Sequence, residues 1–280
     1  MAKQNDFYRR FSRNWSGLVG LVFLILLTAV ALAADKLYPG SPLQMAGQPM
    51  IWPFSDAAFP LGTDRLGRDL AAQLAHGARI SLMIGLSATV FALLLGLLVG
   101  SLAGYFRGGV DSIVMRFCDL VATVPPFLLA LVIVAVLGPS TLKVALAIGV
   151  SSWPPIARIV RAECLALRER EFVLAAVTAG MSDLRIVLTQ VLPNAMTPVI
   201  VMSSILVASA ILNESSLAFL GFTDPNTVSW GIVIGNGKSE LRTAWYIVML
   251  PGFVILLTVL ALNQVNDALN DALNPQLKDR

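Results

Sequence analysis

The stretch that decides the fold lies between Arg79 and Arg107 and reads RISLMIGLSATVFALLLGLLVGSLAGYFR. A helix of about 20 apolar residues is enough to cross the hydrocarbon core of a bilayer, and this uncharged run is longer. A chain inside lipid must satisfy its own backbone hydrogen bonds, so the run is predicted to be a helix. The composition agrees, because 56% of the residues are hydrophobic and only 13% are charged, whereas soluble domains carry about 25% charged residues. We therefore predict an all-α, polytopic membrane protein.

Other apolar stretches can be bracketed by charged or polar residues in the same way. They run from Arg13 to Asp35, Asp119 to Lys143, Arg185 to Glu214 and Arg242 to Asp267. The interval from Lys143 to Arg158 is short, but Thr141 to Val160 serves as a further span if Lys143 extends its charge to the interface. The chain is thus predicted to contain about six transmembrane helices. It divides into an N-terminal segment (1–13), a first transmembrane helix (14–34), an outer loop (35–79), a core domain with five transmembrane helices (80–267) and a C-terminal tail (268–280).

The distribution of positive charge predicts the orientation. If the N-terminus is cytoplasmic, most of the 20 Lys and Arg residues fall on the cytoplasmic side, as the positive-inside rule requires. Both termini are then cytoplasmic. The first span has an alternative interpretation, because basic residues precede an apolar run ending in Ala31-Leu32-Ala33, which is similar to a signal-peptidase site. The run is long for a signal peptide, so a retained first helix is favoured.

Glycines recur every fourth residue in the second span, at Gly96, Gly100 and Gly104. Such a ridge lets another helix approach closely. The partner helix could come from another subunit or from the same bundle. The alternative is a glycine-rich membrane helix without a special contact.

The sequence does not contain the spaced motifs that usually indicate an enzyme active site. Gly237-Lys238-Ser239 is similar to the end of a phosphate-binding loop, but Ile232 stands where that motif needs a glycine. The two cysteines and the single His76 form neither a disulfide framework nor a metal-binding motif. We therefore expect no enzyme activity, and no metal or other cofactor held by this chain.

Two acidic residues, Asp119 and Glu214, lie near the ends of predicted spans. Acids at membrane depth are functional candidates by default, but a proton-coupled carrier would normally place them deeper and would show repeated halves. We interpret both as helix-end or inter-helix partners. A secondary transporter remains the alternative from a different functional class.

A charged interval at 161–194 interrupts the apolar pattern. Within it, residues 171–179 predict a short helix with Glu171 at its N-terminus, where the helix dipole favours an acid, and Gly180 at its C-terminal cap. A second helix at 184–192 is predicted to end or kink at Pro193. The small residues Ala175, Ala176 and Gly180 would let a partner come close, so the segment is interpreted as a mechanical lever. The ordinary alternative is a surface loop.

The same interval resembles the cytoplasmic signature of ABC importer permeases: Glu-Ala-Ala, three residues, Gly, nine residues, Ile, one residue, Leu-Pro. Ala175-Ala176, Gly180 and Leu192-Pro193 meet the spacing. Leu174 and Gln190 depart from it. In the dipeptide and oligopeptide branch the Glu falls three places earlier, which matches Glu171. Blocks at 60–69, 77–82, 104–111, 213–221 and 229–231 are similar to the C permease of that branch, whereas Asn266 and Asn274 depart from the family's ending.

The resemblance implies a type I ABC importer permease fold and a pore-forming subunit that moves di- or oligopeptides across the bacterial inner membrane by alternating access. Nickel, opines, glutathione and oligosaccharides are alternative substrates within the branch. Expected partners are a second homologous permease, two ATPase subunits that bind ATP and Mg, and a periplasmic or lipid-anchored substrate-binding protein. The residues expected to couple to the ATPases are Glu171, Ala175, Ala176, Gly180, Leu192 and Pro193.

Aromatic residues are frequent in the predicted outer segments, which the resemblance places in the periplasm. They are Trp52, Phe54, Phe59, Phe222 and Trp230. Aromatic side chains gather at the membrane–water interface, so we expect these to lie there, with a partner surface as the alternative.

Overall fold

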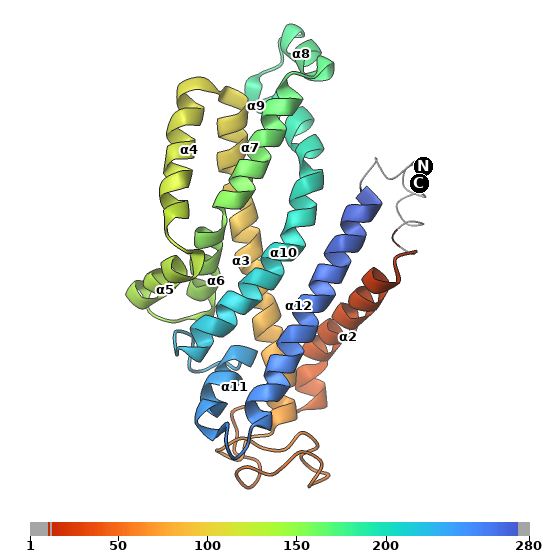
Figure 1. Cartoon of the computed structure of the whole chain (residues 1–280), viewed down its shortest axis with the longest axis vertical. Helices are drawn as coiled ribbons and strands as arrows, with labels where there is room; N and C mark the ends of the chain where they lie inside the picture. The colour runs from red at the N-terminus through yellow and green to blue at the C-terminus, as the bar shows by residue number, and fades with distance from the viewer. Residues whose placement is uncertain (1–10, 12, 274–280) are drawn as a thin grey trace.

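The computed structural model describes residue 11 and residues 13–273, and the long elements among them are helices. The helices α2 (Trp15–Leu37), α3 (Leu70–Phe106), α10 (Leu192–Phe219) and α12 (Tyr246–Leu273) form an elongated bundle (Figure 1). Within the described residues, four helical segments are long and apolar enough to cross a membrane, or five if one bent pair counts as a single span. The all-α, multi-spanning fold class is therefore confirmed. The outermost residues of the two predicted terminal segments lie outside the described ranges.

The first helix, α2, packs closely against α12 and α3. Gly17 and Gly20 face α12, where a side-chain carbon at Gly20 would lie 2.7 Å from the Ala261 carbonyl oxygen. At the other end, Arg79 of α3 binds the Asp35 carboxylate at 2.8 Å and donates to the Ala31 carbonyl at 3.1 Å. The stretch that is similar to a signal-peptidase site thus lies within a helix packed into the bundle.

The helix that contains the second predicted span begins before that span. Helix α3 starts at Leu70 because the Asp69 side chain accepts a hydrogen bond from the Ala71 amide and caps the helix. The loop that precedes α3 is therefore residues 38–69, and Arg79, where the span was predicted to begin, lies within the helix. Its hydrogen bonds hold the loop in place: the Tyr246 hydroxyl donates to the carbonyls of Ile51 at 2.8 Å and Thr63 at 3.1 Å.

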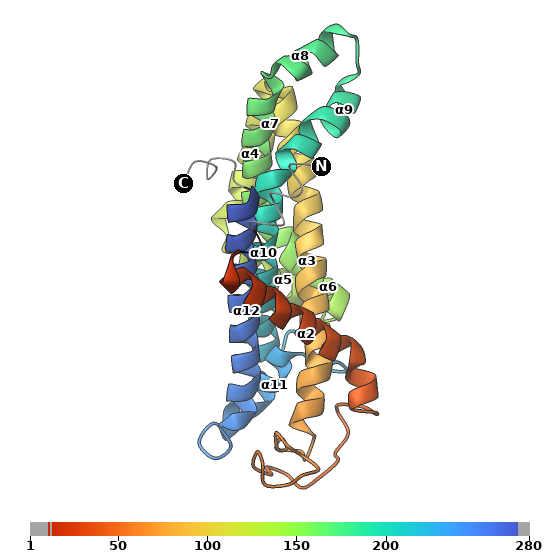
Figure 2. The ribbon, with the colours of Figure 1, turned by 90° about the vertical axis from the view of Figure 1, so that its right-hand side faces the viewer.

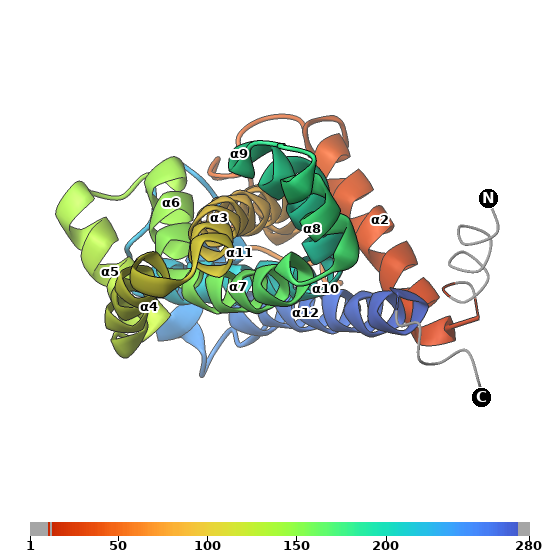
Figure 3. The same ribbon diagram turned by 90° about the horizontal axis from the view of Figure 1, so that it is seen from above.

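The predicted third and fourth spans are each built from two helices. Helices α4 (Gly108–Thr123) and α5 (Pro126–Leu137) meet at an angle of 83°. Proline lacks an amide hydrogen and clashes with the preceding turn, so Pro125-Pro126 breaks the span. Helices α6 (Thr141–Ser152) and α7 (Pro154–Arg168) meet at Trp153, just before a second pair of prolines. Figure 3 shows α4, α5 and α6 on the opposite side of α3 and α10 from α2.

The two ends of the molecule carry different short elements. One end carries α8 (Glu171–Thr178), followed by α9 (Asp183–Ile186) and a π-helical turn, η1 (Val187–Val191), that leads into α10. The other end carries the loop 38–69, α11 (Trp230–Gly237) and the 3-10 turn η2 (Lys238–Glu240), as Figures 1 and 2 show.

Of the two outcomes predicted at Pro193, an end or a kink of the helix, the structure excludes the end. The helical run continues from Asp183 to Phe219. The π turn permits this, because the Leu192 amide bonds to the Val187 carbonyl five residues back, and π turns accommodate local strain inside α-helices.

Candidate functional site

Helix α8 is a short amphipathic helix at the tip of the molecule, between α7 and α9 (Figure 2). Its inner face is formed by Val173, which is fully buried, and Ala176, and both pack into an apolar cluster with Ile186 and Val191. Three further apolar side chains around the helix, Phe172, Leu174 and Val177, are 42%, 50% and 51% exposed. We call these three residues the α8 patch. Exposed apolar side chains gathered at one end of the molecule are suited to contact with a protein partner.

Gly180 ends α8 as the sequence predicted. Its φ of +74° lies in the left-handed region, which glycine enters without the penalty that other residues carry. The Gly180 amide bonds to the Val177 carbonyl at 3.0 Å and the Met181 amide to the Ala176 carbonyl at 3.1 Å, which is the Schellman pattern of helix capping. A side-chain carbon at Gly180 would meet nothing within 4 Å.

The remaining predicted coupling residues do not all lie on one surface. Glu171 and Ala175 are exposed on α8. Ala176 faces its own chain, being only 8% exposed, so the expectation that it would face a partner is wrong. It follows Val173 by three residues, which puts both on the inner face of the helix. Leu192 and Pro193 lie at the start of α10, where Leu192 is half-buried against the same apolar cluster and Pro193 is exposed.

The glycine ridge of α3 faces α7, the helix that leads into α8. A side-chain carbon at Gly96 would lie 2.5 Å from Ile156, and one at Gly100 would lie 2.5 Å from the Ala157 carbonyl oxygen. At Gly104 it would lie 2.6 Å from Cβ of Cys164. The close approach lies within this bundle. It joins α7, the helix that leads into α8, to α3.

Replacing Gly100 by leucine is expected to destabilise the protein by about 1–3 kcal/mol, because overpacking a tight contact costs that much. Gly252 of α12 is the matched control, since a side-chain carbon there meets nothing within 4 Å. Thermal unfolding of the purified variants in detergent measures the difference. Equal melting temperatures for Gly100→Leu and Gly252→Leu would contradict the tight α3–α7 contact.

The two acids near the span ends both face other helices, as the inter-helix interpretation predicted. Asp119 of α4 binds Arg158 of α7 at 2.8 Å. Glu214 of α10 is fully buried, and its carboxylate accepts from the Ser81 hydroxyl of α3 at 3.3 Å. The Ser81 oxygen in turn accepts from the Trp230 amide at 3.3 Å, so this network joins α3, α10 and α11.

Trp230 is a core residue, which corrects its assignment to the membrane interface or a partner surface. It is fully buried, and its indole nitrogen donates to the Leu74 carbonyl at 3.1 Å. A side-chain carbon at Gly77 would lie 3.1 Å from the indole ring, so a glycine of α3 makes room for it. By contrast, Trp52 is 48% exposed and Phe54 is 86% exposed.

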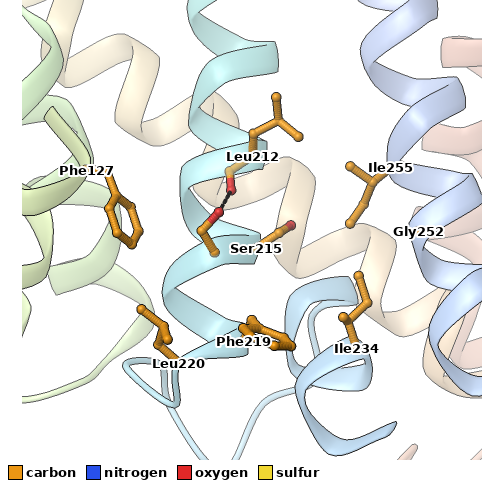
Figure 4. A pocket seen from close by; sticks show the side chains of 9 residues that line it. Phe127, Leu212, Ser215, Phe219, Leu220, Ile234, Gly252 and Ile255 are labelled. Atoms are coloured by element: carbon orange, nitrogen blue, oxygen red, sulfur yellow. Dashed lines mark hydrogen bonds between the residues drawn. The ribbon is translucent and has the colours of Figure 1, made fainter. Parts of the chain in front are cut away.

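An apolar recess of about 450 Å³ lies between α5, α10, α11 and α12 (Figure 4). Its lining residues are Phe127, Leu212, Ser215, Ser216, Phe219, Leu220, Ile234, Gly252 and Ile255. The Ser216 hydroxyl is turned back to the Leu212 carbonyl of its own helix at 2.8 Å. The sequence did not predict this recess, because its residues come from four helices and are indistinguishable in kind from lipid-facing ones.

Two family models match the chain. The model described as "Binding-protein-dependent transport system inner membrane component" matches residues 96–279, and the "N-terminal TM domain of oligopeptide transport permease C" matches residues 5–66. Together they span most of the described helices, including the segment that carries α8.

Curated relatives match nearly the whole chain. The di/tripeptide transport system permease protein DppC of Pseudomonas aeruginosa (strain UCBPP-PA14) is 40% identical over 98% of this chain and 92% of its own length. The dipeptide permease DppC of Bacillus subtilis (strain 168) is 36% identical over 98% and 86%. The glutathione transport system permease protein GsiD of Pectobacterium atrosepticum is 34% identical over 98% and 91%.

A solved structure shares the fold. A chain of the MetNI methionine ABC transporter, in an inward-facing conformation, aligns with a TM-score of 0.54 and 18% identity, covering 70% of this chain and 96% of that one. Identity this low supports the architecture alone, and that architecture is a type I permease. Taken with the family models and the 40% identical relative, it establishes that the chain belongs to the family of inner-membrane components of binding-protein-dependent transport systems.

Proposed function

We propose that this chain is one of two pore-forming permease subunits of an ATP-driven importer for di- or oligopeptides. The observation that carries the proposal is the 40% identity to a di/tripeptide permease over 98% of the chain. The relative named for glutathione is also similar, at 34%, and glutathione is itself a small peptide. The proposed substrate class is therefore a short peptide, delivered by a binding protein outside the membrane.

The proposed mechanism is alternating access driven through α8. Two partner ATPases bind ATP and Mg, and each holds one short cytoplasmic helix of a permease in a surface groove. The α8 patch, with side chains from 42% to 51% exposed, supplies an apolar face suited to such a groove. ATP can shift the equilibrium between the inward-open and outward-open pore only if it binds one of these states more tightly. In the proposed mechanism ATP closes the two ATPases, and the closed ATPases favour the outward-open pore. Helices α7 and α10, which flank α8 and α9 in the chain, pass the movement into the bundle.

The proposed orientation puts α8 and both termini in the cytoplasm. The excess of Lys and Arg on that side supports it. The loop 38–69 and α11, at the opposite end of the molecule (Figure 1), then face the periplasm and the binding protein. The whole assembly sits in the inner membrane, with the second permease completing the pore.

The purified chain in liposomes should neither hydrolyse ATP nor take up peptide, whereas the complete set of two permeases, two ATPases and the binding protein should do both. Radiolabelled dipeptide uptake with and without ATP in the lumen measures this. Uptake by the single chain, driven by an ion gradient, would replace the proposal with a secondary transporter.

A further inference from the structure

Tyr105 stands where three helices meet at the base of α8. It is the penultimate residue of α3 and is only 2% exposed. Its hydroxyl donates to the Asp183 carboxylate at 2.8 Å. Its backbone carbonyl accepts a hydrogen bond from the Arg168 guanidinium, and that guanidinium lies 5.0 Å from the centre of the Tyr105 ring.

The two partners of Tyr105 lie on either side of α8 in the chain. Arg168 is the last residue of α7, and Asp183 is the first residue of α9. One residue of α3 therefore contacts both ends of the segment that carries α8. The neighbouring Arg107 adds a second attachment at the α7 end of the segment. Its guanidinium binds the Glu169 carboxylate at 2.6 Å and the Leu165 carbonyl at 3.2 Å.

The segment between these two ends has few contacts of its own. On α8 only Val173 and Ala176 are buried, and the space around Gly180 is open. A displacement of α8 alone can be taken up by bending at the adjoining turns, so that only part of it reaches the bundle through the packing of Val173 and Ala176. The contacts of Tyr105 instead tie both ends of the segment to α3. Helix α3 is not adjacent to α8 in the chain, so α8 acts on it through α7, which packs on the glycine ridge of α3, and through the contacts of Tyr105.

We propose that Tyr105 is a positioning residue that clamps both ends of the α8 segment to α3, so that displacement of α8 moves α3 together with α7 and α10. The proposal rests on the proposed function of α8 as the site of ATPase coupling. Loss of the clamp leaves the α8 patch and the ATPases in place, and weakens only the link between hydrolysis and transport.

The test uses the complete importer in liposomes with Tyr105→Phe, which keeps the ring and removes the hydroxyl bond to Asp183. Bonds to charged groups contribute more than neutral ones, and 1.4 kcal/mol corresponds to a tenfold change. The peptide transported per ATP hydrolysed should therefore fall about tenfold, while ATPase copurification and hydrolysis stay near the wild-type level. Asp183→Asn keeps an acceptor oxygen and should retain most of the coupling. Thr189→Val is the matched control, because the Thr189 hydroxyl bonds within its own helix, to the Arg185 carbonyl.

The clamp would be overturned by wild-type coupling in Tyr105→Phe, and equally by fully additive losses when Tyr105→Phe is combined with Asp183→Ala. Hydrogen–deuterium exchange of the purified chain tests the clamp independently of transport. Exchange at residues 171–182 should rise in Tyr105→Phe and stay unchanged in Thr189→Val. If the wild-type complex itself fails to couple ATP to uptake while exchange rises as expected, the proposed function fails and the clamp stands. Unchanged exchange overturns the clamp.

Discussion

Replacing Leu174 and Val177 together by aspartate should abolish ATP-driven uptake by the assembled importer. Both side chains are about half exposed on α8, so the substitution removes only part of their packing within this chain and leaves the buried Val173 and Ala176 in place. Docking against an ATPase groove would bury both carboxylates without partners. Leaving one buried charge unpaired costs about 3–5 kcal/mol, which corresponds to a loss of affinity of about two to three and a half orders of magnitude at 1.4 kcal/mol per tenfold.

Copurification of the ATPases with the permease pair measures the loss directly, and peptide uptake measures its consequence. Phe54→Asp is the control, because Phe54 is 86% exposed in the loop at the opposite end of the molecule. It should leave ATPase copurification unchanged. If the double variant copurifies with its ATPases and imports at the native rate, the α8 patch is not the docking surface.

The features of α8 that depend on local chemistry could be predicted from the sequence. An acid at the start of the helix and a glycine at its end are local signals, and the structure has Glu171 and Gly180 at those positions. The direction of each side chain was not predicted in the same way. The three-residue spacing of Val173 and Ala176 is the pattern that indicates a shared buried face. The small size of Ala176 equally fits a close approach by a partner, so the sequence alone does not decide between the two.

The helix boundaries differ from the predicted span boundaries for an equally physical reason. A charged residue is expected to mark the end of an apolar helix. Arg79 nevertheless lies inside α3, because its guanidinium binds Asp35 and the Ala31 carbonyl at the end of α2. An uncharged run can also contain a helix break that charge alone does not reveal. The proline pairs at 125–126 and 154–155 interrupt helices without adding any charge, and they are the signal that could have divided the third and fourth spans.

The burial of Trp230 could not be predicted locally, because it depends on residues far away in the chain. Its indole bonds to Leu74 and fits beside Gly77, both in α3. Its amide joins the Ser81–Glu214 network. A tryptophan in an outer segment is therefore the anchor that holds α11 to α3.

Trp230→Ala should destabilise the protein by about 3–5 kcal/mol, the usual cost of truncating a fully buried tryptophan. It should also end uptake, because α11 would lose its attachment at the proposed periplasmic end of the pore. Trp245→Ala is the matched control, since Trp245 is 51% exposed beside Trp52. The unfolding temperature of Trp230→Phe should lie between those of Trp230→Ala and Trp245→Ala, because phenylalanine keeps an aromatic ring but loses the hydrogen bond to Leu74. Thermal unfolding of the purified complexes and peptide uptake measure the series. Equal unfolding temperatures for Trp230→Ala and Trp245→Ala would show that α11 is held by other contacts.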